Sequence, residues 1–70
     1  MTTDHCAGLK ADHCEFNSER LFVDVSDSMF LGAGSLGTEI RKRATAYCLE
    51  FPRARVVVQF GNGRTTRDCR

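Results

Sequence analysis

Apolar and polar residues alternate along one segment of the chain and cluster in another. In residues 20–26, RLFVDVS, the apolar side chains of Leu21, Val23 and Val25 occupy every second position. Strict alternation is typical of a strand with one buried face, so this segment is predicted to be a half-buried strand. Residues 55–60, RVVVQF, contain three valines and a phenylalanine, which are strong strand formers. The chain is therefore expected to contain at least two strands.

A β-hairpin is expected directly after the second strand. The dipeptide Asn62-Gly63 favours a type I′ turn, because both central positions of that turn need positive φ. With these two residues as the loop, the returning strand covers residues 64–69 and Phe60 faces Thr65. The charged residues of the returning strand suit an exposed sheet edge.

A helical period runs from Ser35 to Phe51. Ser35 or Thr38 can cap the first turn, because their hydroxyl groups accept hydrogen bonds from unpaired backbone N–H groups. Pro52 disfavours helical geometry at the residue before it, so the helix is expected to end at Phe51. The apolar residues that share one helix face are Ile40, Ala44, Tyr47, Cys48 and Phe51.

These elements predict an α+β, or small α/β, domain in which one amphipathic helix packs on a three- to four-stranded sheet ending in a β-hairpin. Residues 29–31, MFL, could start a further strand. Whether the strands at 20–26 and 55–60 are parallel is left open; if they are, the helix is a right-handed crossover. Residues 1–18 show no clean period and are expected to form an irregular arm before a single domain over residues 19–70.

The composition limits what such a domain can do. A chain of 70 residues forms one domain at most and buries only about 60% of its unfolded surface, so a metal, disulfide or partner is expected to support the fold. No apolar run reaches the roughly 18 residues of a membrane span. The opening residues, MTTDH, lack the basic and apolar regions of a signal peptide. We therefore expect a soluble, cytoplasmic protein that does not bind membranes.

The charge is distributed unevenly along the chain. Residues 1–27 have a net charge of −4 and residues 28–70 a net charge of +5. The basic excess predicts a surface for nucleic acid or for an acidic protein partner. The alternative is that the two halves face and neutralise each other. The basic residues expected to be exposed and to contact the partner are Arg41, Lys42, Arg43, Arg64 and Arg67.

The tripeptide Asp-His-Cys occurs twice, at residues 4–6 and 12–14. Zinc prefers four tetrahedral ligands, usually thiolate or imidazole, so a structural zinc site is one interpretation. A disulfide that joins Cys6 to Cys14, or one of them to Cys69, is a second, and free thiols in a reducing cytosol are a third. No cofactor is the main expectation, with zinc as the alternative. The candidate zinc ligands are Cys6, His13, Cys14 and Cys69.

Residues 24–28, DVSDS, match the pattern D-x-S-x-S at the end of the first predicted strand. They resemble the metal-binding motif of von Willebrand factor A-type domains. The predicted order of elements over residues 20–68 is similar to the opening third of that family. The resemblance implies a hard divalent cation, such as Mg²⁺, bound by oxygen ligands. The implied ligands are Asp24, Ser26 and Ser28.

In size and expected architecture the chain also resembles small phage-encoded accessory proteins, of which the anti-CRISPR proteins are the best-known class. This resemblance implies a non-enzymatic inhibitor that binds a larger protein or ribonucleoprotein complex in the host cytoplasm and covers one of its surfaces. No nucleophile, acid and base converge in the sequence, so no enzyme is expected.

Two other functions remain open from the sequence. One is a zinc-stapled module that binds nucleic acid through the basic residues. The other is a divalent-cation-dependent adhesion module of the von Willebrand A type. A homodimer is a further possibility for any of these functions, because an exposed hairpin edge and a thin core both favour association.

Overall fold

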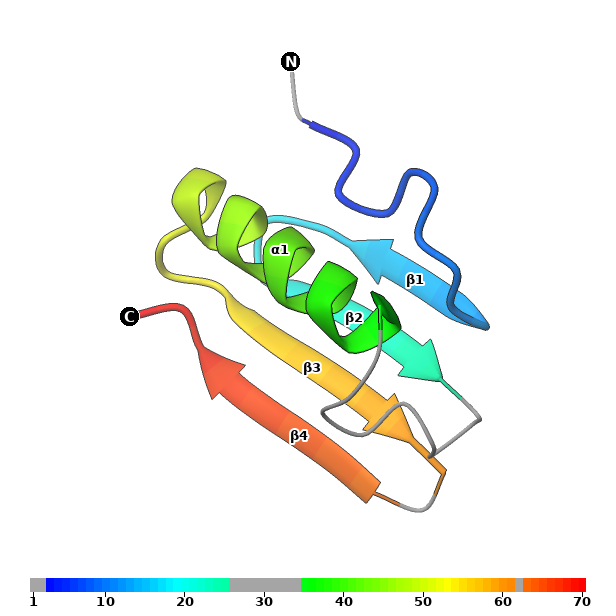
Figure 1. The fold of residues 1–70 in the computed structure, drawn as a ribbon. Helices are drawn as coiled ribbons and strands as arrows, with labels where there is room; N and C mark the ends of the chain where they lie inside the picture. Colours follow the sequence, from blue (N-terminus) through cyan, green and yellow to red (C-terminus); the bar gives the residue numbers. More distant parts are fainter. Residues whose placement is uncertain (1–2, 26–34, 62) are drawn as a thin grey trace.

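The computed structural model describes residues 3–25, 35–61 and 63–70, and within them four strands form one mixed sheet with a single helix on one face (Figure 1). This arrangement confirms the predicted α+β architecture, including the hairpin at its end. The elements are β1 (His13–Phe16), β2 (Arg20–Val25), α1 (Ser35–Glu50), β3 (Arg55–Phe60) and β4 (Gly63–Asp68). The strands lie side by side in chain order, so β1 is the neighbour of β2, and β3 is the neighbour of β4.

Strands β2 and β3 are parallel neighbours at the centre of the sheet. Their register places Leu21 beside Val56 and Val25 beside Phe60. Helix α1 connects them as the right-handed crossover that such units adopt. This settles the pairing that the sequence left open. The further strand expected to start at residues 29–31 lies outside the described residues.

The core lies between α1 and the β2–β3 pair. Leu21 and Val23 are fully buried on the helix side of β2, as their alternation predicted. Tyr47 is fully buried on the facing side of the helix. The helix ends one residue earlier than predicted, before Pro52. No helix among the described residues is long and apolar enough to span a membrane.

Strand β1 forms inside the segment that was expected to be an irregular arm. His13–Phe16 pairs antiparallel with β2, with Cys14 opposite Val23 and Phe16 opposite Leu21. The expectation of an arm without strands over residues 1–18 is therefore wrong for these four residues. The alternation is present but covers only one short stretch, in which His13 and Glu15 take the exposed positions. Four residues are too few for a period to stand out in the sequence.

The hairpin has a different register from the predicted one. Phe60 lies opposite Gly63, not Thr65, so the loop consists of positions 61 and 62. Gly61 has φ of 54°, which suits the first position of a two-residue turn. A Cβ atom at position 63 would come within 2.8 Å of the Phe60 ring, so any larger residue there would require the ring to move. Because the shift is two residues, every side chain keeps its predicted face.

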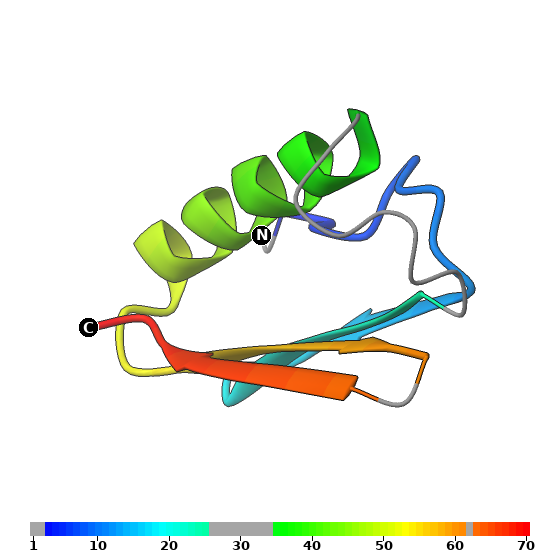
Figure 2. The same cartoon turned by 60° about the horizontal axis from the view of Figure 1, so that its bottom comes forward.

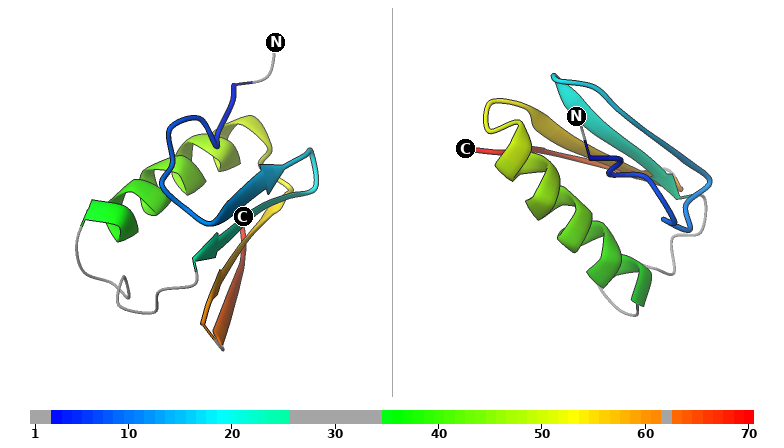
Figure 3. Two further views of the ribbon diagram at one scale, coloured as in Figure 1. Left: turned by 90° about the vertical axis from the view of Figure 1, so that its right-hand side faces the viewer. Right: turned by 90° about the horizontal axis from the view of Figure 1, so that it is seen from above.

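The segment before β1, which we call the arm (residues 3–12), packs against one flank of α1 on the helix side of the sheet (Figures 2 and 3). His5 is its anchor and is only 3% exposed. Its Nε2 lies 2.7 Å from a carboxylate oxygen of Glu50, and its ring meets Phe16 and Tyr47 edge-on at centroid distances of 5.1 and 5.3 Å. Arg43 donates a hydrogen bond to the His5 carbonyl oxygen. The arm is thus fastened to the helix by both polar and aromatic contacts.

Tyr47 links the helix to the turn between β1 and β2. Its hydroxyl donates a 2.7 Å hydrogen bond to the carbonyl oxygen of Asn17. Burial raises the pKa of Tyr47, and the nearby Glu19 carboxylate adds to this effect. The phenol therefore stays protonated and keeps donating this bond at neutral pH.

Two disulfides hold opposite sides of the helix layer. Cys6–Cys14 ties the arm to β1 across a separation of 8 residues, and Cys48–Cys69 ties α1 to the end of β4 across 21 residues. We expect the paired Cys48→Ala and Cys69→Ala changes to lower the free energy of unfolding by about 3 kcal/mol, because the longer loop gains more chain entropy when unfolded.

Urea unfolding under non-reducing conditions measures this loss. The matched control is the pair Cys6→Ala and Cys14→Ala, which opens the shorter loop and is expected to cost less. An equal or larger loss in the control pair would contradict the expectation that the disulfide closing the longer loop contributes more to stability.

Candidate partner-binding groove

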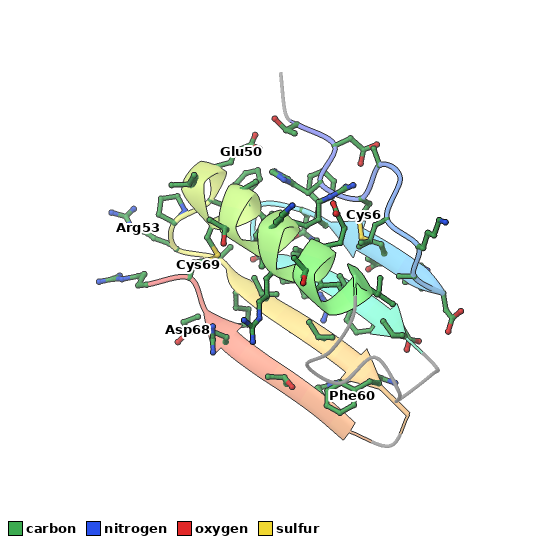
Figure 4. All side chains as sticks on the ribbon, viewed as in Figure 1. Cys6, Glu50, Arg53, Phe60, Asp68 and Cys69 are labelled. Carbon is green, nitrogen blue, oxygen red and sulfur yellow. A yellow bond between two sulfur atoms is a disulfide. The ribbon has the colours of Figure 1, made fainter. Side chains whose placement is uncertain are left out.

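A groove of about 660 Å³ runs along the flank of α1 that faces β4. Its floor is apolar and is formed by the helix-side residues of β3. Phe60 stands at the hairpin end and Cys69 at the other end, as Figure 4 shows. The volume lies within the roughly 300–1,000 Å³ range of protein ligand sites. The apolar lining residues are Ile40, Ala44, Cys48, Leu49, Val56, Val58, Phe60 and Cys69.

The groove exists because α1 does not extend over β4. Tyr47 and Ile40 direct the helix onto β2 and β3, while the arm fills the other flank, above β1. In the described parts of the chain, nothing equivalent to the arm covers β4. Leu49, on the groove side of α1, is consequently 80% exposed. An exposed large apolar residue beside an apolar groove is typical of a binding surface.

Two arginines stand on opposite walls of the groove. Arg41 comes from α1 and Arg67 from β4. Within residues 3–25, 35–61 and 63–70, neither guanidinium group has a hydrogen bond or ion pair. Asp68 also borders the groove, but its side chain lies on the opposite face of β4, where its carboxylate is 3.6 Å from Nε of Arg55. The groove therefore offers an apolar floor and two uncompensated positive charges.

The five basic residues predicted to contact a partner do not form one surface. Arg41 and Arg67 line the groove, and Lys42 is exposed on α1 without lining it. Arg43 forms an ion pair with Glu39 at 2.9 Å and donates a hydrogen bond to the His5 carbonyl oxygen of the arm. Its guanidinium group is therefore already paired within the protein. Arg64 lies on the opposite face of the sheet, where it donates to Gln59. The continuous basic face expected from the sequence is thus divided.

We call the side of the sheet that faces away from α1 the open face. Acidic and basic groups alternate on it, so it has no excess of positive charge. Arg20 stacks on the ring of Phe22 at 5.4 Å, and His13 lies 2.7 Å from Glu15. The hydrogen bond from His13 lowers the pKa of Glu15, and Arg20 adds a smaller effect of the same sign. The charged residues of this face are His13, Glu15, Arg20, Asp24, Arg55, Arg64 and Asp68.

All four cysteines are paired, so the interpretation as free thiols is wrong for this structure. Cys6–Cys14 was one of the alternatives that the sequence left open. Disulfides persist in oxidising compartments and are rare in the cytosol. The form described here therefore needs an oxidising environment, and the cytoplasmic location stays a prediction.

The structure does not bring the candidate zinc ligands together. Cys6 and Cys14 bond to each other, whereas Cys69 bonds to Cys48 on the opposite flank of α1. His13 points to the open face, away from the sulfur of its neighbour. No group of three His, Cys, Asp or Glu side chains among the described residues could hold a metal ion. Zinc binding by the reduced chain stays a prediction.

The implied cation ligands of the D-x-S-x-S motif are only partly described. Asp24 lies on the open face of β2, in register with His13 and Gln59. Ser26 and Ser28 lie outside the described residues. A divalent cation held by these three residues stays a prediction.

Three features of the structure were not predicted from the sequence. The Cys48–Cys69 bond joins residues that the helix and the hairpin bring together from distant positions. The burial of His5 was also not predicted, because burial is inferred from the periodicity of apolar residues and the segment around His5 has no such periodicity. The exposure of Leu49 could have been inferred, since it falls off the apolar face of the predicted helix.

Comparison with known proteins adds no relative to this description. The fold and groove define a small α+β domain with a disulfide on each side of its helix. No protein-family model, curated protein or solved structure matches the chain.

The His13–Glu15 pair on the open face can be tested by titration. Because the folded-state pKa of Glu15 is depressed, the pair stabilises the fold above the ordinary pKa of 4.5, and this stabilisation is lost as pH falls through the lowered value. We expect His13→Ala to raise the pKa of Glu15 back toward 4.5. An NMR titration of the side-chain carboxyl carbon measures both values. The same midpoint in wild type and variant would show that His13 does not hold the carboxylate.

Proposed function

We propose that this protein is a non-enzymatic binding module that captures an acidic, partly apolar segment of a larger protein in the groove between α1 and β4. The observation that supports the proposal most is the pair of uncompensated arginines, Arg41 and Arg67, on opposite walls of an apolar groove. An apolar side chain of the partner would lose contact with water on the groove floor. A carboxylate beside it would pair with one guanidinium group, and a second carboxylate would neutralise the other.

The charge pattern favours a protein segment over nucleic acid. A nucleic-acid site needs several basic groups along one surface. Here Arg64 and Arg43 are separated from the groove, and the open face balances its arginines with acids. The aromatic rings of Tyr47 and Phe51 pack around His5 and offer no exposed platform for bases. Two positive charges and an apolar floor match a short acidic peptide better.

A narrower function within this class is that of a small phage-type inhibitor, similar to anti-CRISPR proteins. The segment bound in the groove would then belong to a protein or ribonucleoprotein complex whose surface is covered. The support is the size of the chain and the small groove that the described residues form, rather than any shared motif. Such a module would act by occupying space, so the affinity of the groove would set its potency.

A selection from displayed random dodecapeptides tests the proposal although the natural partner is unidentified. We expect the enriched peptides to carry acidic residues beside one or two large apolar residues. The combined change Arg41→Glu and Arg67→Glu is expected to weaken a selected peptide by about tenfold or more, because it replaces two attractions with two repulsions. Fluorescence anisotropy with the synthetic peptide measures the dissociation constant.

The matched control combines Lys42→Glu with Arg53→Glu, which changes the net charge equally on exposed residues that do not line the groove. Binding in the control should stay within about twofold of wild type. Enrichment of peptides without acidic residues, or equal weakening in both double variants, would contradict the proposal.

A further inference from the structure

Strand β4 forms one edge of the sheet, and half of its backbone groups face away from β3. The N–H of Cys69 donates to the carbonyl oxygen of Ala54, which continues the β3–β4 ladder beyond Asp68. Hydrogen-bonding direction alternates along a strand in an antiparallel pair. Positions 65, 67 and 69 therefore direct their N–H and C=O groups toward β3. Positions 64, 66 and 68 direct theirs outward, where none of the described strands pairs with them.

This edge runs directly beside the groove. Thr65 and Arg67 direct their side chains to the helix side and line the groove, while Arg64, Thr66 and Asp68 direct theirs to the open face. Side chains alternate between the two faces of any strand added to a sheet. Every second side chain of a strand paired with β4 would therefore stand next to the groove. The backbone edge and the groove can serve one ligand together.

We propose that the partner's segment binds as a fifth strand, antiparallel to β4, with its alternate side chains directed into the groove. This inference rests on the proposed function and adds the binding mode to it. Main-chain hydrogen bonds to positions 64, 66 and 68 supply the attachment, and the groove supplies the sequence preference, as in other proteins that bind peptides by strand addition.

The charges of β4 specify the strand that fits. An acidic residue is required opposite Arg64 and another opposite Arg67, and a basic residue suits the position opposite Asp68. The position opposite Thr65 faces the groove and takes a large apolar side chain. From its N-terminus, the matching antiparallel segment therefore has the order basic, acidic, Thr, apolar, acidic.

A second copy of this chain fits the same edge less well. Two β4 strands paired about Thr66 would match Arg64 with Asp68 of the partner subunit on the open face. On the groove side, however, Arg67 would face a threonine, because β4 contains one acidic residue, Asp68. Arg41 would also stay uncompensated. An acidic partner segment supplies a carboxylate opposite Arg67 on the groove side, which a second copy does not, so we assign the edge to such a segment.

The positive charge of the edge also explains why a bare strand need not aggregate. Charged side chains on edge strands oppose pairing with unrelated chains. Arg64 and Arg67 repel basic strands, offer no charge partner to neutral ones and attract acidic ones, so the charges that oppose unrelated pairing also give a preference for an acidic strand. The same two residues thus protect the free protein and select its ligand.

The test uses a capped synthetic peptide with the core Lys-Glu-Thr-Leu-Glu and three forms of the protein. Thr66→Pro removes an outward-facing N–H without breaking the ladder to β3, and proline is tolerated at such edge positions. Thr66→Val is the matched control that keeps the N–H group. We expect wild type and Thr66→Val to bind equally and Thr66→Pro to bind roughly tenfold or more weakly, with amide exchange at position 66 slowed by peptide only in the first two.

A second pair of probes leaves the protein unchanged, in case Thr66→Pro does not fold. N-methylation of the central threonine removes the donor that faces β4 and should weaken binding as strongly as the proline. N-methylation of the following leucine removes a donor that faces away and should change binding by less than about twofold. The reversed core sequence controls for direction and should bind weakly.

The outcomes separate the binding mode from the proposed function. If the peptide perturbs groove residues but tolerates threonine N-methylation and Thr66→Pro, strand addition is wrong while groove binding stands. No binding of the peptide to wild-type protein would also overturn strand addition, whereas the dodecapeptide selection would still decide the proposed function. Protection of Thr66 that grows with protein concentration in the absence of peptide would assign the edge to a second copy and overturn the inference.

Discussion

The width of one helix against four strands is the constraint on which the rest of this structure depends. An α-helix with its side chains is about 10–12 Å across, and neighbouring strands lie about 4.8 Å apart. A single helix can therefore cover about two strands, and α1 covers the parallel pair β2 and β3 that it connects. The strands on either side, β1 and β4, need another cover or stay open on the helix side.

The helix sides of β1 and β4 are covered to different extents. Above β1, the arm takes the place of a second helix, with His5 inserted among aromatic rings and Cys6–Cys14 closing the connection. Beside β4, the Cys48–Cys69 bond fixes the helix end but leaves the flank hollow. The closed flank contributes stability, and the open flank, where Arg41 and Arg67 have no ion pair among the described residues, is the proposed binding surface. The asymmetry of the domain is therefore the basis of its proposed function.

Local chemistry explains which parts of this fold were predictable. Pro52 marks the end of α1, and the consecutive valines of β3 identify a strand without reference to the rest of the chain. Strand β1 was missed because its pairing with β2, rather than its own short pattern, makes it a strand. The hairpin register differs from the predicted one by two residues and places the Phe60 ring over Gly63, a cross-strand contact that turn propensity does not contain.

The candidate groove was harder to predict from the sequence than the fold was, although two of its residues had been predicted to contact a partner. Arg41 and Arg67 were predicted as partner contacts from exposure alone, together with Lys42, Arg43 and Arg64. Only the lateral position of α1 decides which of these share a groove, and that position follows from how Tyr47 and the arm pack. Cys48 was expected to be a small buried apolar residue, because nothing local shows that β4 brings Cys69 to it.

The central claim is that the β4 flank is open in the free protein while the β1 flank is closed. Methyl relaxation by a soluble paramagnetic gadolinium chelate tests this claim most directly. The account predicts that the methyl groups of Ala44 and Val58 relax much faster in its presence than those of Leu21 and Val23, which are fully buried. Leu49 provides the exposed reference. Equal protection of all four core and groove residues would show that the flank is already covered and would contradict the account.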